Sequence, residues 1–177
     1  MGVPQTEQYA KRCRGQLRVL RRLLFVRRPH AFLLKKSQMT PHFSLAELST
    51  TDHRKFDNTP PPEVLPNLMR MALLMEQVRS LLGQPIFVTS GYRSKQVNDA
   101  VGSKDTSQHR LGCAVDFKCA RLTPDQIVKR IKASDLAFDQ LIREFDSWTH
   151  ISVPSSQGAA PRRQALIIDR AGARPFV

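Results

Sequence analysis

Two histidines and one aspartate in this sequence have the types expected of ligands for a single metal ion. His109 and Asp116 lie seven residues apart, and His150 follows 34 residues after Asp116. Two imidazoles and one carboxylate form the ligand set of a catalytic zinc site, which keeps a fourth position open for water. The pattern therefore predicts hydrolysis by a zinc-activated water molecule. The alternative is that both histidines are ordinary polar residues, because short motifs also match by chance.

The elements around these residues must bring them to one place. Side chains alternate between the two faces of a strand, so a strand over 112–117 turns Ala114 and Asp116 to one face and Val115 and Phe117 to the other. The small residues beside the aspartate leave room for a metal and a substrate, whereas the opposite face suits the core. His150 falls in a second predicted strand, and the two strands must be near neighbours in the sheet.

The remaining pattern predicts one α+β domain over 39–177, with a small antiparallel sheet flanked by helices. Apolar residues at spacings of three and four over 63–82 predict a helix with one buried stripe. Thr123 followed by Pro124 predicts the start of another helix, which runs to about residue 133. Ser44 and Glu47 have the spacing of a capping box. A further short helix is predicted over 95–101, and the other strands are predicted over 86–90, 138–142, 149–153 and 164–169.

The net charge of +13 resides mainly in the first 38 residues, which hold ten lysines and arginines and one acid. We expect this basic arm, 1–38, to be disordered or partly helical, as termini usually are. A basic arm can also contact nucleic acid, anionic lipid or an anionic cell-wall polymer. No recognition helix or aromatic platform accompanies the charge, so nucleic acid is not an expected partner.

The sequence contains no apolar stretch that would predict a membrane span, because arginines interrupt the most apolar part of the arm. The same arginines argue against a conventional signal peptide. Three cysteines, Cys13, Cys113 and Cys119, have no metal-binding spacing and are expected to be free thiols.

A wider set of residues resembles the zinc D-Ala-D-Ala carboxypeptidase family. The central motif is Ser-x-His-x-x-Gly-x-Ala-x-Asp at 107–116, followed by Trp-x-His at 148–150. Matching blocks fall in family order at 41–48, 58–60, 90–94 with Asn98, 101–103 and 138–142. The resemblance covers roughly residues 40–155. This family includes vancomycin-resistance dipeptidases and phage L-alanyl-D-glutamate endolysins, and it shares its fold with the hedgehog amino domain.

The resemblance implies that His109, Asp116 and His150 bind zinc and that Arg93 contacts the substrate. A planar guanidinium can hold a carboxylate or polarise the scissile carbonyl, although a structural ion pair is the alternative role. Ser107 matches the serine of the motif, which could bond to substrate or to a metal ligand. Its alternative role is that of a turn-forming hydroxyl.

A zinc peptidase also needs a general base. Many relatives place an acid three residues before the last histidine, where this sequence has Ser147. The phage-like subgroup that the chain most resembles carries a glutamate at the position of Glu144, which is the first candidate. Asp146 is the second, with a turn-forming aspartate as its alternative role.

Taken together, these residues predict a zinc peptidase that cuts stem peptides of bacterial peptidoglycan, as a carboxypeptidase or as an endolysin-like endopeptidase. The rival hypothesis is a catalytically silent zinc-containing binding module, or a phage structural part, on the same fold. The enzyme would act on the cell wall from the periplasmic or extracellular side, or would be carried in a phage particle. Both a lysis enzyme and a virion component fit this prediction.

Overall fold

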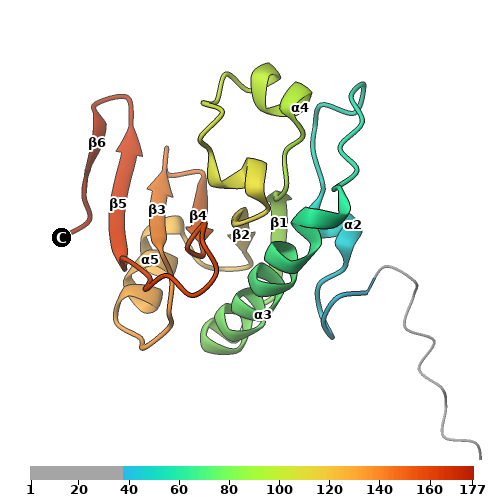
Figure 1. Cartoon of the computed structure of the whole chain (residues 1–177). Helices are drawn as coiled ribbons and strands as arrows, with labels where there is room; N and C mark the ends of the chain where they lie inside the picture. The colour runs from blue at the N-terminus through green and yellow to red at the C-terminus, as the bar shows by residue number, and fades with distance from the viewer. Residues whose placement is uncertain (1–37) are drawn as a thin grey trace, which may run out of the picture. The chain divides into compact units, whose positions relative to one another are not determined.

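The computed structural model describes residues 38–177, and Figure 1 shows their arrangement. The basic arm predicted for 1–38 lies outside the described residues except for Gln38, and so does Cys13. The helices are α2 (Leu45–Leu48), α3 (Leu65–Leu82), α4 (Lys95–Ala100) and α5 (Pro124–Lys132), with 3₁₀ helices η1 (Pro62–Val64) and η2 (Gln108–Leu111). The strands are β1 (Ile86–Ser90), β2 (Ala114–Cys119), β3 (Gln140–Glu144), β4 (Trp148–Ser152), β5 (Gln164–Asp169) and β6 (Gly172–Pro175).

Local signals account for where the helices begin and end. Ser44 forms the predicted capping box with Glu47 at the start of α2, and Thr123 forms another with Gln126 at the start of α5. Helix α3 ends at Gly83, whose φ of 63° is the left-handed conformation that glycine adopts without strain. The predicted helices over 63–82, 95–101 and 123–133 are therefore confirmed to within a few residues.

The six strands form one sheet in the order β1-β2-β4-β3-β5-β6. All neighbouring pairs are antiparallel except β3 and β5, which run parallel. The parallel pair arises because the loop after β4 stays at the end of the sheet where β3 begins, so Gln164 pairs with Gln140. The fold class is confirmed as a small α+β peptidase fold, and this one pair departs from the expected all-antiparallel sheet. Strand β6 was not predicted, because its four residues carry no apolar alternation.

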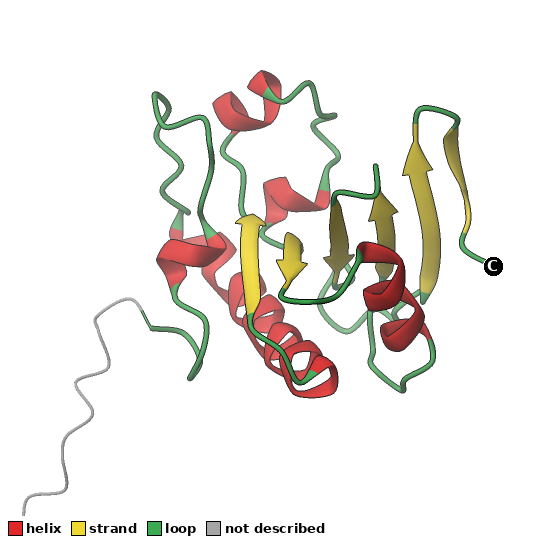
Figure 2. Cartoon of the chain, turned by 180° about the vertical axis from the view of Figure 1, so that it is seen from behind, coloured by secondary structure: helices red, strands yellow, loops and turns green. Residues whose placement is uncertain are grey.

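One face of the sheet packs into the core. Strand residues such as Val115, Phe117 and Ile151 join the buried stripes of α3 and α5 in one hydrophobic cluster. In Figure 2, α3 is the long helix at the lower centre and α5 is the shorter helix at the lower right. The neighbours of these strand residues, among them Asp116 and His150, belong to the other face. The sheet thus separates a packed face from a face that is free to form a site.

Two further predictions concern the thiols and the membrane. Cys113 and Cys119 are buried free thiols, as the cysteine count indicated. None of the helices that the structure describes is long and apolar enough to span a bilayer.

Candidate metal centre

The side chains of His109, Asp116 and His150 converge on one point at the surface of the sheet. Nδ1 of His150 lies 2.8 Å from Oδ1 of Asp116, and Nε2 of His109 lies 3.2 Å from each of these two atoms. All three residues are buried. Residues that are far apart in the sequence therefore present one nitrogen or oxygen each to a common centre.

Strand pairing brings Asp116 and His150 together. The two residues are direct partners in the antiparallel pair β2–β4, so their side chains leave the same face of the sheet side by side. Ala114, two residues before Asp116, belongs to the same face and adds only a methyl group there. The pairing of β1 with β2 shifts between Val88 and Ser90, a bulge of the kind that re-aims side chains near active sites.

His109 reaches the centre from η2, and a backbone carbonyl sets its protonation. Its Nδ1 lies 2.7 Å from the carbonyl oxygen of Gly91. A carbonyl accepts and cannot donate, so Nδ1 carries the proton and Nε2 presents a lone pair. Metal-bound histidines usually donate their second ring proton in this way, which also fixes the ring orientation.

The three converging atoms fit a divalent metal better than a hydrogen-bonded cluster. Nε2 of His109 and Oδ1 of Asp116 both carry lone pairs, and one proton on Nδ1 of His150 cannot satisfy both. A cation between them removes this repulsion. Ligands at 2.0–2.1 Å in a tetrahedral site lie about 3.3 Å apart, close to the observed separations of 2.8 and 3.2 Å. These residues therefore fit zinc.

The electrostatics keep the ligands in their metal-binding forms. Burial opposes ionisation of Asp116, but the two imidazoles outweigh burial and hold the pKa of Asp116 well below its usual range. Burial also lowers the pKa of His109, although Asp116 opposes this shift. At neutral pH the centre thus offers a carboxylate and a neutral imidazole, the forms in which both groups bind metals.

Arg93 contacts the other oxygen of the same carboxylate. Its Nη2 donates to Oδ2 of Asp116 at 2.6 Å, and its Nε donates to Oγ of Ser90 at 2.9 Å. The ion pair that sequence reasoning offered as the alternative is therefore present. Arg93 also lines a cavity beside the centre, where the rest of its guanidinium can reach a substrate. The substrate contact stays a prediction.

Glu144, the first candidate for the base, lines the same cavity as Asp116 and Arg93. It sits at the end of β3 directly opposite Trp148, whose indole Nε1 donates to Oε2 of Glu144 at 2.9 Å. Burial, followed by the charge of Asp116, raises the pKa of Glu144. A carboxylate with a raised pKa is a stronger base than an ordinary glutamate, as general base catalysis requires.

Asp146, the second candidate, lies away from the centre. Phe145 and Asp146 both adopt positive φ values, of 50° and 52°, in the turn between β3 and β4. The turn directs the Asp146 carboxylate to Nε of Arg143 at 3.0 Å, and its side chain is 70% exposed. Arg143 in turn contacts Asp125 of α5, on the packed face of the sheet. The structure thus brings Glu144, and not Asp146, to the candidate centre.

Ser107 caps η2, where its Oγ accepts from the backbone N–H of His109 at 3.4 Å. This contact supports the role of Ser107 as a turn-forming hydroxyl. Ser107 also lines a second cavity, of about 660 Å³, which His150 lines as well. The first cavity, with Glu144 and Arg93, has a volume of about 430 Å³. Two cavities of ligand-binding size thus border the candidate centre, one lined by Asp116 and the other by His150.

Sequence reasoning missed the role of the Gly91 backbone. A Cβ atom on this residue would lie 2.1 Å from the carbonyl oxygen of Leu48, so only glycine fits there. We expect Gly91→Ala to push the carbonyl away from His109, to weaken zinc affinity about tenfold and to reduce the unfolding free energy by about 2 kcal/mol. Zinc titration and chemical denaturation measure the two effects.

Gly83→Ala is the matched control for this variant. Gly83 also lies outside the regular elements, but a Cβ atom there meets nothing within 4 Å and is strained by its φ alone. We expect a cost of about 1 kcal/mol in stability with unchanged zinc affinity. Equal zinc affinities for Gly91→Ala and the wild type would contradict the role of the carbonyl.

The raised pKa of Glu144 also predicts a stability effect in the metal-free protein. Because the folded state holds its proton to higher pH than the unfolded state, stability falls as the pH rises from the ordinary glutamate pKa through the raised pKa of Glu144. Glu144→Gln keeps an acceptor for Trp148 and removes this loss. Chemical denaturation of both proteins in chelator measures their unfolding free energies. Relative to the wild type, the unfolding free energy of the variant should rise by about 1.4 kcal/mol per unit of pKa shift as the pH passes through that window. A difference between the two proteins that does not change with pH would contradict this prediction.

Comparison with known proteins agrees with this geometry. The profile of the family described as Peptidase M15 matches residues 41–152, which include the three candidate ligands, Arg93 and Glu144. The matched segment is more than half of the chain. No curated protein matches the sequence. The chain therefore belongs to the peptidase M15 family, a family of zinc peptidases of the D-Ala-D-Ala carboxypeptidase type that act on peptidoglycan.

Proposed function

We propose that this chain is a zinc-dependent hydrolase of peptide bonds in the D-amino-acid-containing stem peptides of bacterial peptidoglycan. The observation that carries the proposal is the convergence of Nε2 of His109, Oδ1 of Asp116 and Nδ1 of His150 within 3.2 Å of one another. When bound there, zinc would supply a Lewis acid and a water molecule whose pKa is lowered towards about 7.

The protein's own groups have distinct roles in this proposal. Glu144 accepts a proton at its carboxylate and passes it to the leaving amine, because it lines the cleft with a raised pKa. Arg93 uses two of its five N–H groups on Ser90 and Asp116, so three remain to hold the substrate carbonyl. Its bond to Oδ2 of Asp116 leaves Oδ1 as the oxygen that would hold the zinc ion.

The placement of Glu144 favours an enzyme over a silent binding module. A structural zinc site needs no carboxylate of raised pKa in an open cavity beside its ligands. We also propose that catalysis resides in residues 39–177, since the ligands and the base all lie there. A variant lacking 1–38 should then digest cell walls as the whole chain does.

Metal analysis together with mass spectrometry of digested peptidoglycan tests the proposal. We expect one zinc ion per chain, release of stem-peptide fragments, loss of this activity in chelator and its recovery when zinc is added back. A folded preparation that binds no zinc, or digestion that chelator does not affect, would contradict the proposal.

A further inference from the structure

A groove over the far part of the sheet extends the candidate active site. We call it the β5 groove. It is the cavity of about 660 Å³, and it is lined by Ile142 of β3, by Leu166 and Ile168 of β5, and by Lys104 and Arg162 at its rim. His150 also lines it, so the groove begins at a candidate zinc ligand.

The strand register makes the floor of the groove continuous with the candidate metal centre. Asp116 pairs with His150, His150 with Ile142, and Ile142 with Leu166, so these four residues form one row across the sheet. Two strand spacings separate His150 from Leu166, a distance of about 10 Å. An extended peptide covers that distance with about three residues.

The rim of the β5 groove is positively charged. Lys104 makes no ion pair with any of the residues that the structure describes, whereas Arg162 is bound to the buried carboxylate of Asp139. No aspartate or glutamate is among the residues that line the groove. The ammonium group of Lys104 is therefore available to an anionic group of a bound peptide.

A second cavity also borders the candidate centre, and we treat the two cavities as the two arms of one cleft. The cavity of about 430 Å³ is lined by Asp116 and Arg93, and also by Val97, Val101 and His53. A carboxypeptidase must bind a free terminal carboxylate next to the scissile bond, which closes one arm of the cleft to further residues. Here both arms exceed the size of one residue, because each lies within the range of whole ligand pockets.

We propose that the enzyme is an endopeptidase whose substrate peptide extends from the zinc site into both cavities and places a carboxylate on Lys104 in the β5 groove. This inference rests on the proposed function, and it selects internal bonds over the terminal bond of the peptide. The ammonium group of Lys104 is complementary to an anionic group of a peptide, and His150 belongs both to the groove and to the candidate zinc site. For these two reasons we assign the groove to the substrate.

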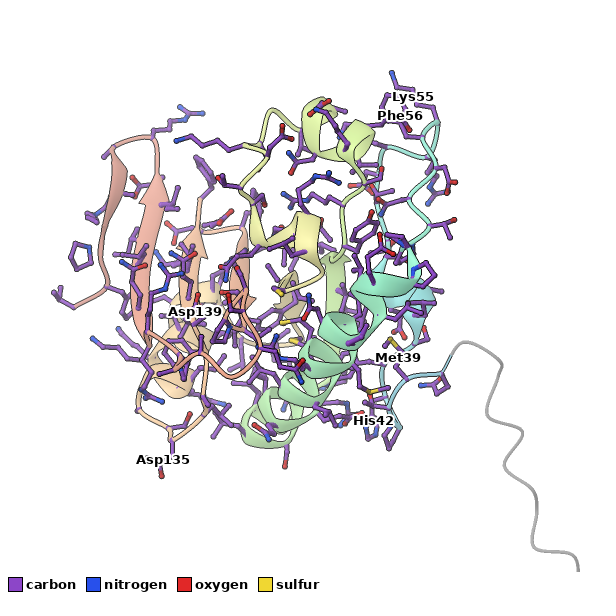
Figure 3. All side chains as sticks on the ribbon, in the orientation of Figure 1. Met39, His42, Lys55, Phe56, Asp135 and Asp139 are labelled. Carbon is purple, nitrogen blue, oxygen red and sulfur yellow. The ribbon has the colours of Figure 1, made fainter. Side chains whose placement is uncertain are left out.

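The far wall of the groove lies outside the part of the chain that matches the family. The match ends at residue 152, whereas Leu166, Ile168 and Arg162 come later. Arg162 fixes this later segment, because Nε and Nη2 of Arg162 donate to Asp139 at 2.9 and 2.5 Å. Figure 3 labels Asp139, which lies beside the loop that leads into β5. The C-terminal segment thus supplies the far wall of the β5 groove, whereas Lys104 lies within the part of the chain that matches the family.

The site of cleavage tests the first part of the inference. The substrates are purified stem peptides with a free or an amidated carboxyl terminus, and mass spectrometry identifies their products. We expect a cut at the same internal bond in both peptides, whatever the difference in rate between them. Release of the terminal residue alone, with no cut in the amidated peptide, would overturn the inference and leave the proposed function intact. Failure to cut any stem peptide would instead count against the proposed function.

Charge reversal at Lys104 tests the second part. We expect Lys104→Glu to lower kcat/KM about tenfold for a peptide with a free side-chain or α-carboxylate, and to change it little for the same peptide with that group amidated. Lys104→Arg should retain the preference. Arg130→Glu, on α5, makes the same change of net charge outside both cavities and should leave both values unchanged. Equal losses on the two peptides would overturn the assignment of Lys104.

Discussion

His109→Ala is expected to remove zinc and to reduce peptidase activity to background without unfolding the protein. The substitution leaves Asp116 and His150 as two ligands, and two ligands do not hold catalytic zinc. The third ligand, His109, is lost together with the hydrogen bond from its Nδ1 to the carbonyl oxygen of Gly91. Metal content per chain, cell-wall digestion and circular dichroism measure the three parts of this result.

Thermal unfolding gives this prediction an independent readout. A ligand present at a thousand times its dissociation constant stabilises the folded state by about 4 kcal/mol, so zinc should raise the melting temperature of the wild type and not that of His109→Ala. His42→Ala is the matched control, because His42 contacts Glu76 and not the metal centre. An active, zinc-containing His109→Ala protein would exclude His109 as a ligand.

Glu144→Gln is expected to lower kcat by about 10²–10⁴-fold while one zinc ion per chain remains bound. Glutamine has the same shape and still accepts the hydrogen bond from Trp148, but it cannot take up a proton. The loss should therefore appear in kcat rather than in KM. Steady-state kinetics on a purified stem peptide, with metal analysis of the same sample, measure both quantities.

Asp146→Asn separates the two candidate bases. This substitution removes a carboxylate only two residues away, but Asp146 is largely exposed and bound to Arg143 on the packed side of the sheet. We expect nearly full activity from this variant. The opposite pattern, with an active Glu144→Gln and an inactive Asp146→Asn, would transfer the role of base to Asp146.

The sequence predicts well those features that depend on local periodicity. The apolar spacing of α3, the cap at Thr123 and the alternation along β2 each follow from neighbouring residues, and all three are confirmed. The alternation also places Asp116 and Cys113 on opposite faces, because the core cluster includes Cys113, Val115 and Phe117 but not Ala114, which shares the face of Asp116. The direct pairing of Asp116 with His150 then satisfies the expectation of neighbouring strands.

Features that depend on contacts distant in sequence could not be predicted in the same way. The parallel pairing of β5 with β3 is determined by the path of an irregular loop, which carries no periodicity. The carbonyl of Gly91 has no side-chain signature, and its role appears only when His109 lies beside it. The turn between β3 and β4 separates Glu144 from Asp146, although the two acids are nearly adjacent in the sequence.

The burial of Cys113 and Cys119 has a consequence for the redox behaviour of the domain. Burial raises the pKa of both thiols, so the reactive thiolate form is scarce at neutral pH. Cys113, the residue before β2, belongs to the core cluster on the packed face of the sheet, opposite the candidate ligands, where peroxide and disulfide reagents have poor access. The described domain should therefore keep the same covalent structure under oxidising and reducing conditions.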